Sequence, residues 1–157
     1  MLSSMPVRHS HNAQRSPAEF GLRLKRAQHL VGLRVDECLQ PLQLNLGLWR
    51  VLREVGQMPG ASASELARAS MHTSQTLGGL LQRLHGRGLI ERSAPRGRVV
   101  CNYLTEAGSE LLARANAAAD LVMGQILDEF TAADRAALDA LMSRLIDSAS
   151  ASGDLET

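Results

Sequence analysis

The residues best suited to recognition chemistry are four consecutive polar side chains, Thr73, Ser74, Gln75 and Thr76. They open a predicted helix over about residues 73–87, with Thr73 as its N-cap and a leucine stripe on its inner face. Small hydroxyl and amide groups there can reach base edges or phosphates of DNA, and the Gln75 amide can pair with an adenine edge. Free N–H groups at the helix start can also hold a phosphate. This turn is our candidate nucleic-acid contact, together with Ser62 at the start of the preceding short helix.

Two adjacent glycines, Gly78 and Gly79, interrupt the same predicted helix. A glycine inside a helix is less stable than alanine by about 1 kcal/mol, so two in succession need a reason. One reason is tight packing against a neighbouring helix, or simple tolerance. The other is a close approach of the helix backbone to DNA. The sequence leaves both open, and both glycines are candidate contacts.

Arginines gather around this helix. Residues 71–100 contain five arginines and one acid, a net charge of +4 that can serve as a phosphate footprint. These arginines are Arg83, Arg87, Arg92, Arg96 and Arg98. Arg96 and Arg98 lie in a loop between two predicted strands, where an arginine either stays in solvent or enters an adjacent minor groove. We take Arg83, Arg96 and Arg98 as candidate DNA contacts.

The net charge of +1 hides an asymmetry between the two parts of the chain. Residues 1–100 carry 14 Lys and Arg against 6 Asp and Glu (+8), and residues 101–157 carry 3 against 10 (−7). This split suggests a part that faces a polyanion and a part that faces something else. No apolar run approaches the ~18 residues of a membrane span, and no secretory signal pattern occurs. We therefore expect no membrane association and a cytoplasmic location.

The elements that must position these residues are mostly helical. The 157 residues suggest one domain, and with only four aromatic residues the core must be aliphatic, which favours helices. We expect helices over about 17–39, 44–57, 62–69, 73–87, 105–130 and 131–148, and strands over 89–92 and 99–104. Two short helices followed by a β-hairpin form a winged helix-turn-helix, whose second helix enters the DNA major groove. The predicted fold is mainly α with a small β-hairpin wing.

The order of these pieces resembles the multiple-antibiotic-resistance regulator (MarR) family over about residues 20–147. The resemblance rests on the runs Ser62-Ala-Ser-Glu-Leu-Ala, Thr73-Ser-Gln-Thr-Leu, Leu80-Leu-Gln-Arg-Leu, Arg87-Gly-Leu-Ile-Glu-Arg92 and Leu104-Thr-Glu-Ala-Gly108. It implies a homodimer that binds a near-palindromic operator in double-stranded DNA. The winged helix-turn-helix would span about 44–104, and helices at about 17–39 and 105–148 would form a dimerisation lobe. Residues 1–16 and 149–157 are expected to be tails outside the domain at 17–148.

The predicted wing departs from the family pattern, in which an Asp is usually followed by an Arg. The loop here reads Pro95-Arg96-Gly97-Arg98 and contains no acid. From its distance to Leu104-Thr105 we favour Arg98 as the minor-groove residue, with Arg96 as a phosphate contact.

The resemblance also implies a small-molecule effector, because family members commonly bind aromatic acids or phenols between the two lobes. Trp49 can wall such a pocket or be ordinary core, and His29 can contact a ligand or simply lie on the surface. Cys38 and Cys101 lie on apolar stripes, where thiols are usually inert, so we expect neither a disulfide framework nor redox sensing. The histidines show no metal-ligand spacing beyond the close pair His9 and His11, so neither a metal nor another cofactor is expected.

No catalytic motif occurs, so we do not expect an enzyme. The favoured function is a dimeric, ligand-responsive transcriptional repressor that binds a specific operator. The alternative is a winged-helix protein-interaction module without specific DNA binding, since fold alone does not fix function. An interaction module would be expected to show apolar or aromatic side chains at the helix opening, where this chain has Thr73, Ser74 and Gln75.

Overall fold

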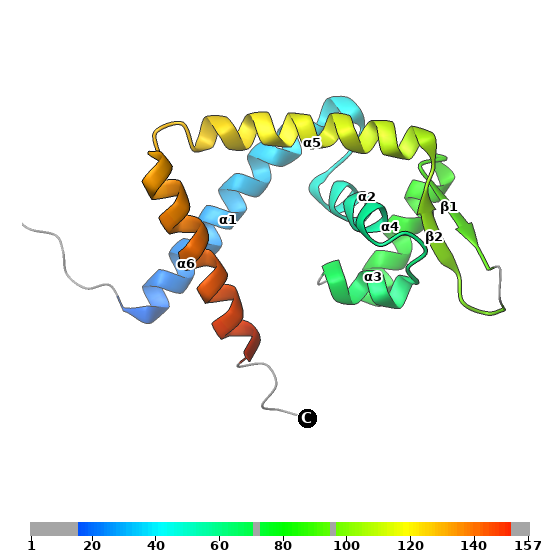
Figure 1. The fold of residues 1–157 in the computed structure, drawn as a ribbon, viewed down its shortest axis with the longest axis horizontal. Helices are drawn as coiled ribbons and strands as arrows, with labels where there is room; N and C mark the ends of the chain where they lie inside the picture. Colours follow the sequence, from blue (N-terminus) through cyan, green and yellow to red (C-terminus); the bar gives the residue numbers. More distant parts are fainter. Residues whose placement is uncertain (1–15, 71–72, 95–96, 152–157) are drawn as a thin grey trace, which may run out of the picture.

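The computed structural model describes residues 16–70, 73–94 and 97–151 as a series of helices with one β-hairpin (Figure 1). The elements are α1 (Pro17–Leu39), the 3-10 helix η1 (Gln40–Leu42), α2 (Leu46–Gln57), α3 (Ala63–Ser70), α4 (Ser74–Gly86), β1 (Ile90–Ser93), β2 (Cys101–Leu104), α5 (Glu106–Ile126) and α6 (Ala132–Ala151). This confirms the mainly α fold with a hairpin wing. None of the described helices is long and apolar enough to cross a membrane.

Side-chain caps start the helices where the sequence predicts them. The oxygens of Ser16, Ser62, Thr73 and Thr105 each accept a hydrogen bond from the backbone N–H three residues later. At Ser16 and Ser62 a glutamate at that later position also bonds back to the serine N–H, which completes a capping box. These bonds satisfy N–H groups that have no partner within the helix, so local sequence sets the boundaries.

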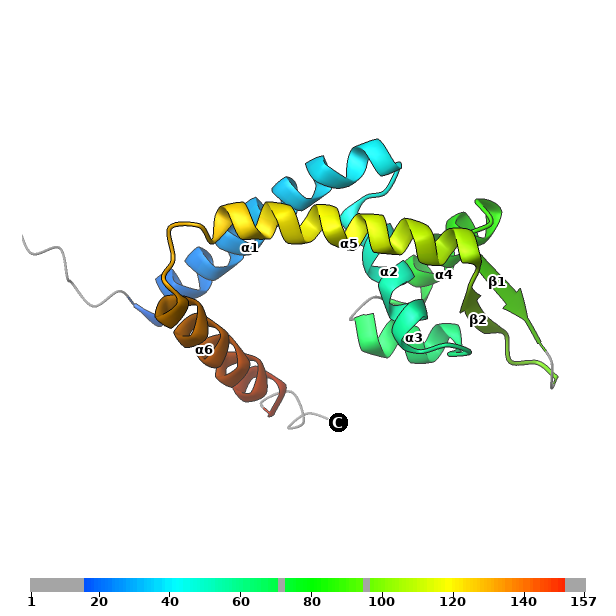
Figure 2. The same cartoon turned by 45° about the horizontal axis from the view of Figure 1, so that its top comes forward.

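The elements form two regions joined by α5. Figures 1 and 2 show α5 as a long bar with the winged-helix lobe (α2, α3, α4, β1 and β2) at one end and α6 at the other. Helix α1 packs against α5. The winged-helix lobe and the helices α1 and α6 thus lie in different parts of the arrangement, with α5 running between them.

The hydrophobic core lies in the winged-helix lobe. Its fully buried side chains are Leu48, Val51, Leu52 and Val55 of α2, Leu66 of α3, Leu77, Leu81 and Leu84 of α4, and Ile90 of β1. Val35 and Leu39 from α1 and Ala115 and Ala119 from α5 extend it. Helix α6 has no buried residue, and its apolar side chains are exposed, including Leu141 at 58% and Ile146 at 56%. In a single chain this stripe is left facing water.

The wing is a two-stranded antiparallel sheet whose register runs from Ile90 opposite Leu104 to Ser93 opposite Cys101. The prediction that the second strand begins at residue 99 is wrong. Strand β1 ends at Ser93, which pairs with Cys101, so β2 begins at Cys101. The hairpin lies close to the start of α5. A side chain at Gly108 would collide with the carbonyl oxygen of Leu89, so only glycine fits this crossing.

Three predicted boundaries near helix ends also need correction. Helix α2 begins at Leu46, not at residue 44, because Asn45 caps it and Gln43 adopts the left-handed conformation with φ of +54°. Helix α5 ends at Ile126, so Phe130 lies in the turn to α6; Arg135 donates to the carbonyls of Leu127 and Phe130 there. Helix α6 continues to Ala151, so the expectation that a tail begins at residue 149 is wrong, and residues 152–157 lie outside the described part of the chain.

Candidate nucleic-acid interface and ligand cleft

The four polar residues at the start of α4 fall into two groups, those that cap the helix and those that are free. Thr73 Oγ1 accepts from the Thr76 N–H at 3.2 Å and donates to Thr76 Oγ1 at 2.9 Å, so these two hydroxyls form the helix cap. Ser74 and Gln75 are exposed, and their side chains have no hydrogen-bond partner among the described residues. The groups free to meet a ligand at this turn are therefore the Ser74 hydroxyl and the Gln75 amide.

The glycine pair leaves part of the α4 backbone bare. Apart from the adjacent residues and the backbone of α4 itself, no atom of the described residues lies within 4 Å of the place where a Cβ would stand at Gly78 or at Gly79. Tight packing against a helix of the same chain is therefore not the reason for these glycines. Gly79 is exposed and stands four residues after Gln75 and four before Arg83, so the three share one face of the helix. That face can approach another molecule at backbone distance.

The structure divides the arginines that the sequence groups together. Arg83 and Arg98 are exposed and have no ion-pair or hydrogen-bond partner among the described residues. Arg87 instead donates from Nη1 to the carbonyl of Gln43 at 2.7 Å. The Nε of Arg92 is buried without a partner in the described part of the chain. Arg96 lies outside the described residues, as does Pro95 before it.

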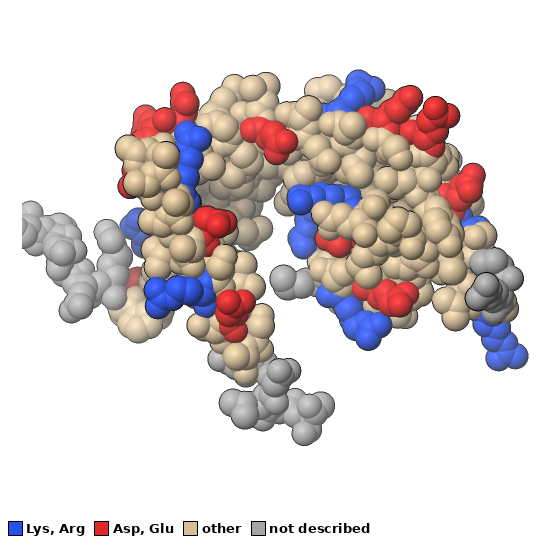
Figure 3. Space-filling model, in the orientation of Figure 1, with Lys and Arg blue, Asp and Glu red and all other residues tan. Residues whose placement is uncertain are grey.

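The basic side chains form a partial border around the lobe. Figure 3 shows Lys and Arg at the wing end and at the lower edge of the winged-helix lobe, where Asp and Glu lie beside them, and several Asp and Glu along the top over α5, with Lys and Arg among them. Basic and acidic side chains are therefore interspersed on this face of the lobe, and the charge split of the sequence does not divide the face into two regions of opposite sign.

Ser62 contributes differently from the α4 residues. Its hydroxyl donates to the Glu65 carboxylate at 2.7 Å and accepts from the Glu65 N–H. The Ser62 N–H and hydroxyl together hold the pKa of the exposed Glu65 carboxyl below its usual range. A charged carboxylate beside this serine would repel a phosphate, and the hydroxyl is already used as a cap.

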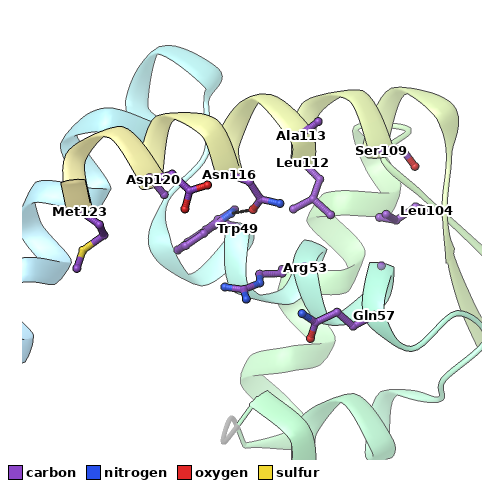
Figure 4. Close-up of a pocket in the computed structure, with 12 residues that line it drawn as sticks. Trp49, Arg53, Gln57, Leu104, Ser109, Leu112, Ala113, Asn116, Asp120 and Met123 are labelled. Atoms are coloured by element: carbon purple, nitrogen blue, oxygen red, sulfur yellow. Dashed lines mark hydrogen bonds between the residues drawn. The ribbon is translucent and has the colours of Figure 1, made fainter. Parts of the chain in front are cut away.

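A cleft of about 670 Å³ separates α2 from α5 on the side of the winged-helix lobe that faces the long helices. Figure 4 shows Trp49 and Arg53 from α2 facing Leu112, Asn116 and Met123 from α5. Trp49 is half-buried; its Nε1 donates to Asn116 Oδ1 at 2.9 Å, and its ring lies 5.8 Å from the guanidinium carbon of Arg53. The cleft thus offers a flat aromatic wall beside a cation.

The sequence analysis found only part of this cleft. It singled out Trp49, but Arg53 and Asn116 were missed. The spacing of Trp49 and Arg53, four residues apart on a predicted helix, was the available signal for the first. No signal in the sequence pairs Asn116 with α2, 67 positions away from Trp49. His29 is exposed on α1 and does not line the cleft.

Cys38 and Cys101 are both half-buried, and both are free thiols. Cys38 Sγ donates to the carbonyl of Val35 at 3.1 Å, and burial raises the pKa of its thiol. A raised pKa lowers the fraction of reactive thiolate, in line with the expectation of an inert side chain.

Comparison with known proteins points to one family. Residues 42–98 match the MarR family model. The HTH-type transcriptional repressor Rv2887 of Mycobacterium tuberculosis is 31% identical over 130 residues, which cover 82% of this chain and 94% of that protein. The crystal structure of the M. tuberculosis protein with salicylic acid is 30% identical with a TM-score of 0.70, covering 85% of this chain and 98% of that one. Its complex with DNA is 28% identical with a TM-score of 0.71, covering 83% and 98%.

Proposed function

Because the chain belongs to the MarR family of transcriptional regulators, we propose that it is a homodimeric repressor that releases its operator when a small aromatic acid or phenol binds. The observation that carries the proposal is the α4 surface. Its exposed polar side chains, bare glycine backbone and free Arg83 lie on a scaffold whose relative Rv2887 has been crystallised with DNA. We assign the protein to the cytoplasm, where its DNA is, and give it no catalytic role.

In the proposed complex α4 is the recognition helix. Ser74 and Gln75 read base edges in the major groove, and Gly78 and Gly79 allow the helix backbone to come close to DNA. Arg83 binds phosphate. Thr73 and Thr76 contribute through the start of α4, which they cap, whereas Ser62 only positions α3, because the Glu65 carboxylate beside it repels phosphate. Arg98 enters the minor groove from the wing, and Arg96 remains a proposed phosphate contact outside the described residues.

The uncovered apolar stripes supply the dimer contact. Helices α1 and α6 both expose large apolar side chains, which line a shared groove through Phe20, Leu24, Leu138, Leu141, Met142 and Leu145. A second copy is the occupant that a MarR regulator offers, and burial of this surface provides the main free energy of association. Two copies present two recognition helices, which suits a near-palindromic operator.

The effector site is the cleft between α2 and α5. Arg53 can pair with the carboxylate of an aromatic acid, and the ring of that acid can stack on Trp49. The salicylic acid complex of Rv2887 supports this ligand class. A ligand that enters would compete with the hydrogen bond from Trp49 Nε1 to Asn116 Oδ1, which links the DNA-reading lobe to α5.

The test is fluorescence anisotropy of the purified protein on the DNA upstream of its own coding sequence and on a scrambled duplex, at two salt concentrations. We expect tight binding to the promoter alone, with two chains per site, and release on addition of salicylate. Equal weak binding to both duplexes that disappears with salt would overturn the proposal, since it would describe a nonspecific basic surface. Tight binding unaffected by salicylate, benzoate or simple phenols would overturn the effector part only.

A further inference from the structure

Arg87 stands at the end of the recognition helix, and its guanidinium, unlike that of Arg83, is bonded to the end of the α1–η1 segment. We propose that Arg87 is a positioning residue: it ties the end of α4 to the end of α1 and so sets the separation of the two recognition helices in the dimer. The inference rests on the proposed dimeric repressor, and it adds a determinant of which operator spacing that repressor accepts.

The tether consists of two hydrogen bonds between segments far apart in the sequence. Arg87 Nη1 donates to the carbonyl of Gln43 at 2.7 Å, and Nη2 donates to the carbonyl of Leu42 at 3.4 Å. These acceptors are adjacent peptide groups 44 and 45 positions earlier in the chain. A planar guanidinium can donate to both from one side, which a lysine ammonium does not reproduce.

The charge of Arg87 suits this place because two helices end here. Leu42 is the last residue of η1, which continues from α1, and carbonyls at a helix C-terminus lack partners within the helix. Arg87 is also the C-cap of α4, and its own N–H donates to the carbonyl of Arg83. The guanidinium of Arg87 therefore meets the carbonyl end of the α1–η1 segment, and its backbone N–H closes the last turn of α4.

The acceptors are held firmly to α1. Gln43 adopts a left-handed conformation, the only described residue other than glycine to do so, and its N–H donates to the carbonyl of Gln40 at 2.8 Å. On the other side of the turn, the Asp36 carboxylate accepts from the Leu46 N–H at 2.5 Å and joins α1 to the start of α2. Because α1 also packs against α5, the two hydrogen bonds from Arg87 connect α4 to the helices proposed to dimerise.

A consequence for DNA follows from the geometry of the duplex. One inserted base pair moves a half-site by about 3.4 Å and rotates it by about 34°. A dimer whose recognition helices are fixed cannot follow this change, whereas a dimer with loosened lobes can. Loss of Arg87 should therefore weaken binding at the best spacing and reduce the discrimination against other spacings.

The experiment uses the full chain and a duplex that the wild-type protein selects from a random-sequence pool. Affinity is measured on this duplex and on versions with one base pair added or removed between the half-sites, each at several salt concentrations. The variants are Arg87→Ala, Arg87→Lys and Asp36→Ala, with Arg83→Ala as the matched control on the DNA side of α4. Asp36→Ala opens the same junction without changing a residue near DNA.

We expect Arg87→Ala to bind the best duplex about tenfold more weakly, as for a lost charged hydrogen bond, with a smaller difference between spacings. Arg87→Lys and Asp36→Ala should also reduce that difference, and all three should keep the salt slope within about half a unit. Arg83→Ala should lower the slope by about one unit and leave the spacing preference unchanged.

Two results would overturn the tether. One is a slope reduced by about one unit in Arg87→Ala with the spacing preference intact, which is the behaviour of a phosphate contact. The other is wild-type affinity and spacing preference in all three junction variants. If Arg87→Ala does not fold, the lysine and Asp36 variants decide the question alone. If the wild-type protein selects no duplex, the proposed repressor function fails instead.

Discussion

Replacing Gly79 with alanine should stabilise the fold and weaken operator binding at the same time. Outside the backbone of α4 and the adjacent residues, the added methyl group meets no atom of the described residues within 4 Å, so the change brings no steric clash there. Alanine is favoured over glycine in a helix interior by about 1 kcal/mol, which corresponds to a rise in Tm of about 2–4 °C for a domain of this size. In the complex, the same methyl group would stand between the α4 backbone and DNA. We expect a loss of about 1.4 kcal/mol, or about tenfold in Kd.

The assay pairs a thermal melt at fixed protein concentration with anisotropy on the operator at fixed salt. Gly86→Ala is the matched control, since Gly86 lies in the last turn of the same helix and also has open space around it. It should leave operator binding unchanged. If Gly79→Ala raises Tm and binds the operator as tightly as the wild-type protein, the bare backbone does not approach DNA and the α4 interface is wrongly placed.

Three other predictions follow from the site. Arg98→Ala should weaken operator binding and lower the salt slope by about one unit; an unchanged affinity at several salt concentrations would remove the wing from the interface. Arg53→Ala should weaken salicylate binding about tenfold and leave operator affinity unchanged. Salicylate binding is measured from the fluorescence of Trp49, the only tryptophan in the sequence. Salicylate binding as tight as that of the wild-type protein would contradict the pairing of Arg53 with the carboxylate. Leu141→Asp should shift the protein to monomers in analytical ultracentrifugation and abolish tight operator binding, whereas a fully dimeric variant would contradict the proposed α1 and α6 interface.

Local chemistry explains why so much of the fold could be predicted. Ser16, Ser62, Thr73 and Thr105 cap four helices through bonds that span three residues, and such bonds depend on almost nothing distant. The errors occur where distant groups decide. The end of α5 depends on Arg135 of the next helix, and the start of β2 depends on where its partner β1 stops. Neither partner is recognisable from the segment itself.

In the candidate site, too, the features set by local sequence could be predicted and those set by distant residues could not. The sequence indicated the polar opening of α4 and the basic charge around it, because helical periodicity shows which residues share a face. It could not separate the arginines, because Arg83 and Arg87 are one turn apart and chemically identical. Their difference comes from two carbonyls about 45 positions away, which the fold brings to one of them. A count of the arginines in the sequence therefore overstates the number of positive charges that are available to bind phosphate.

The proposed effector cleft and the proposed DNA surface on α4 can communicate through α2. This helix supplies Trp49 and Arg53 to the cleft, and its buried face packs against α3 and α4. The other wall of the cleft belongs to α5, which also packs against α1 and so belongs with the proposed dimerisation helices. A ligand changes operator affinity only as far as it binds one arrangement of α2 and α5 better than another. If salicylate favours an arrangement with unsuitable spacing of the recognition helices, the operator must weaken salicylate binding by the same factor. The Arg87 tether makes this coupling stronger, because an α4 fixed to the α1 end cannot adjust independently when the cleft changes width.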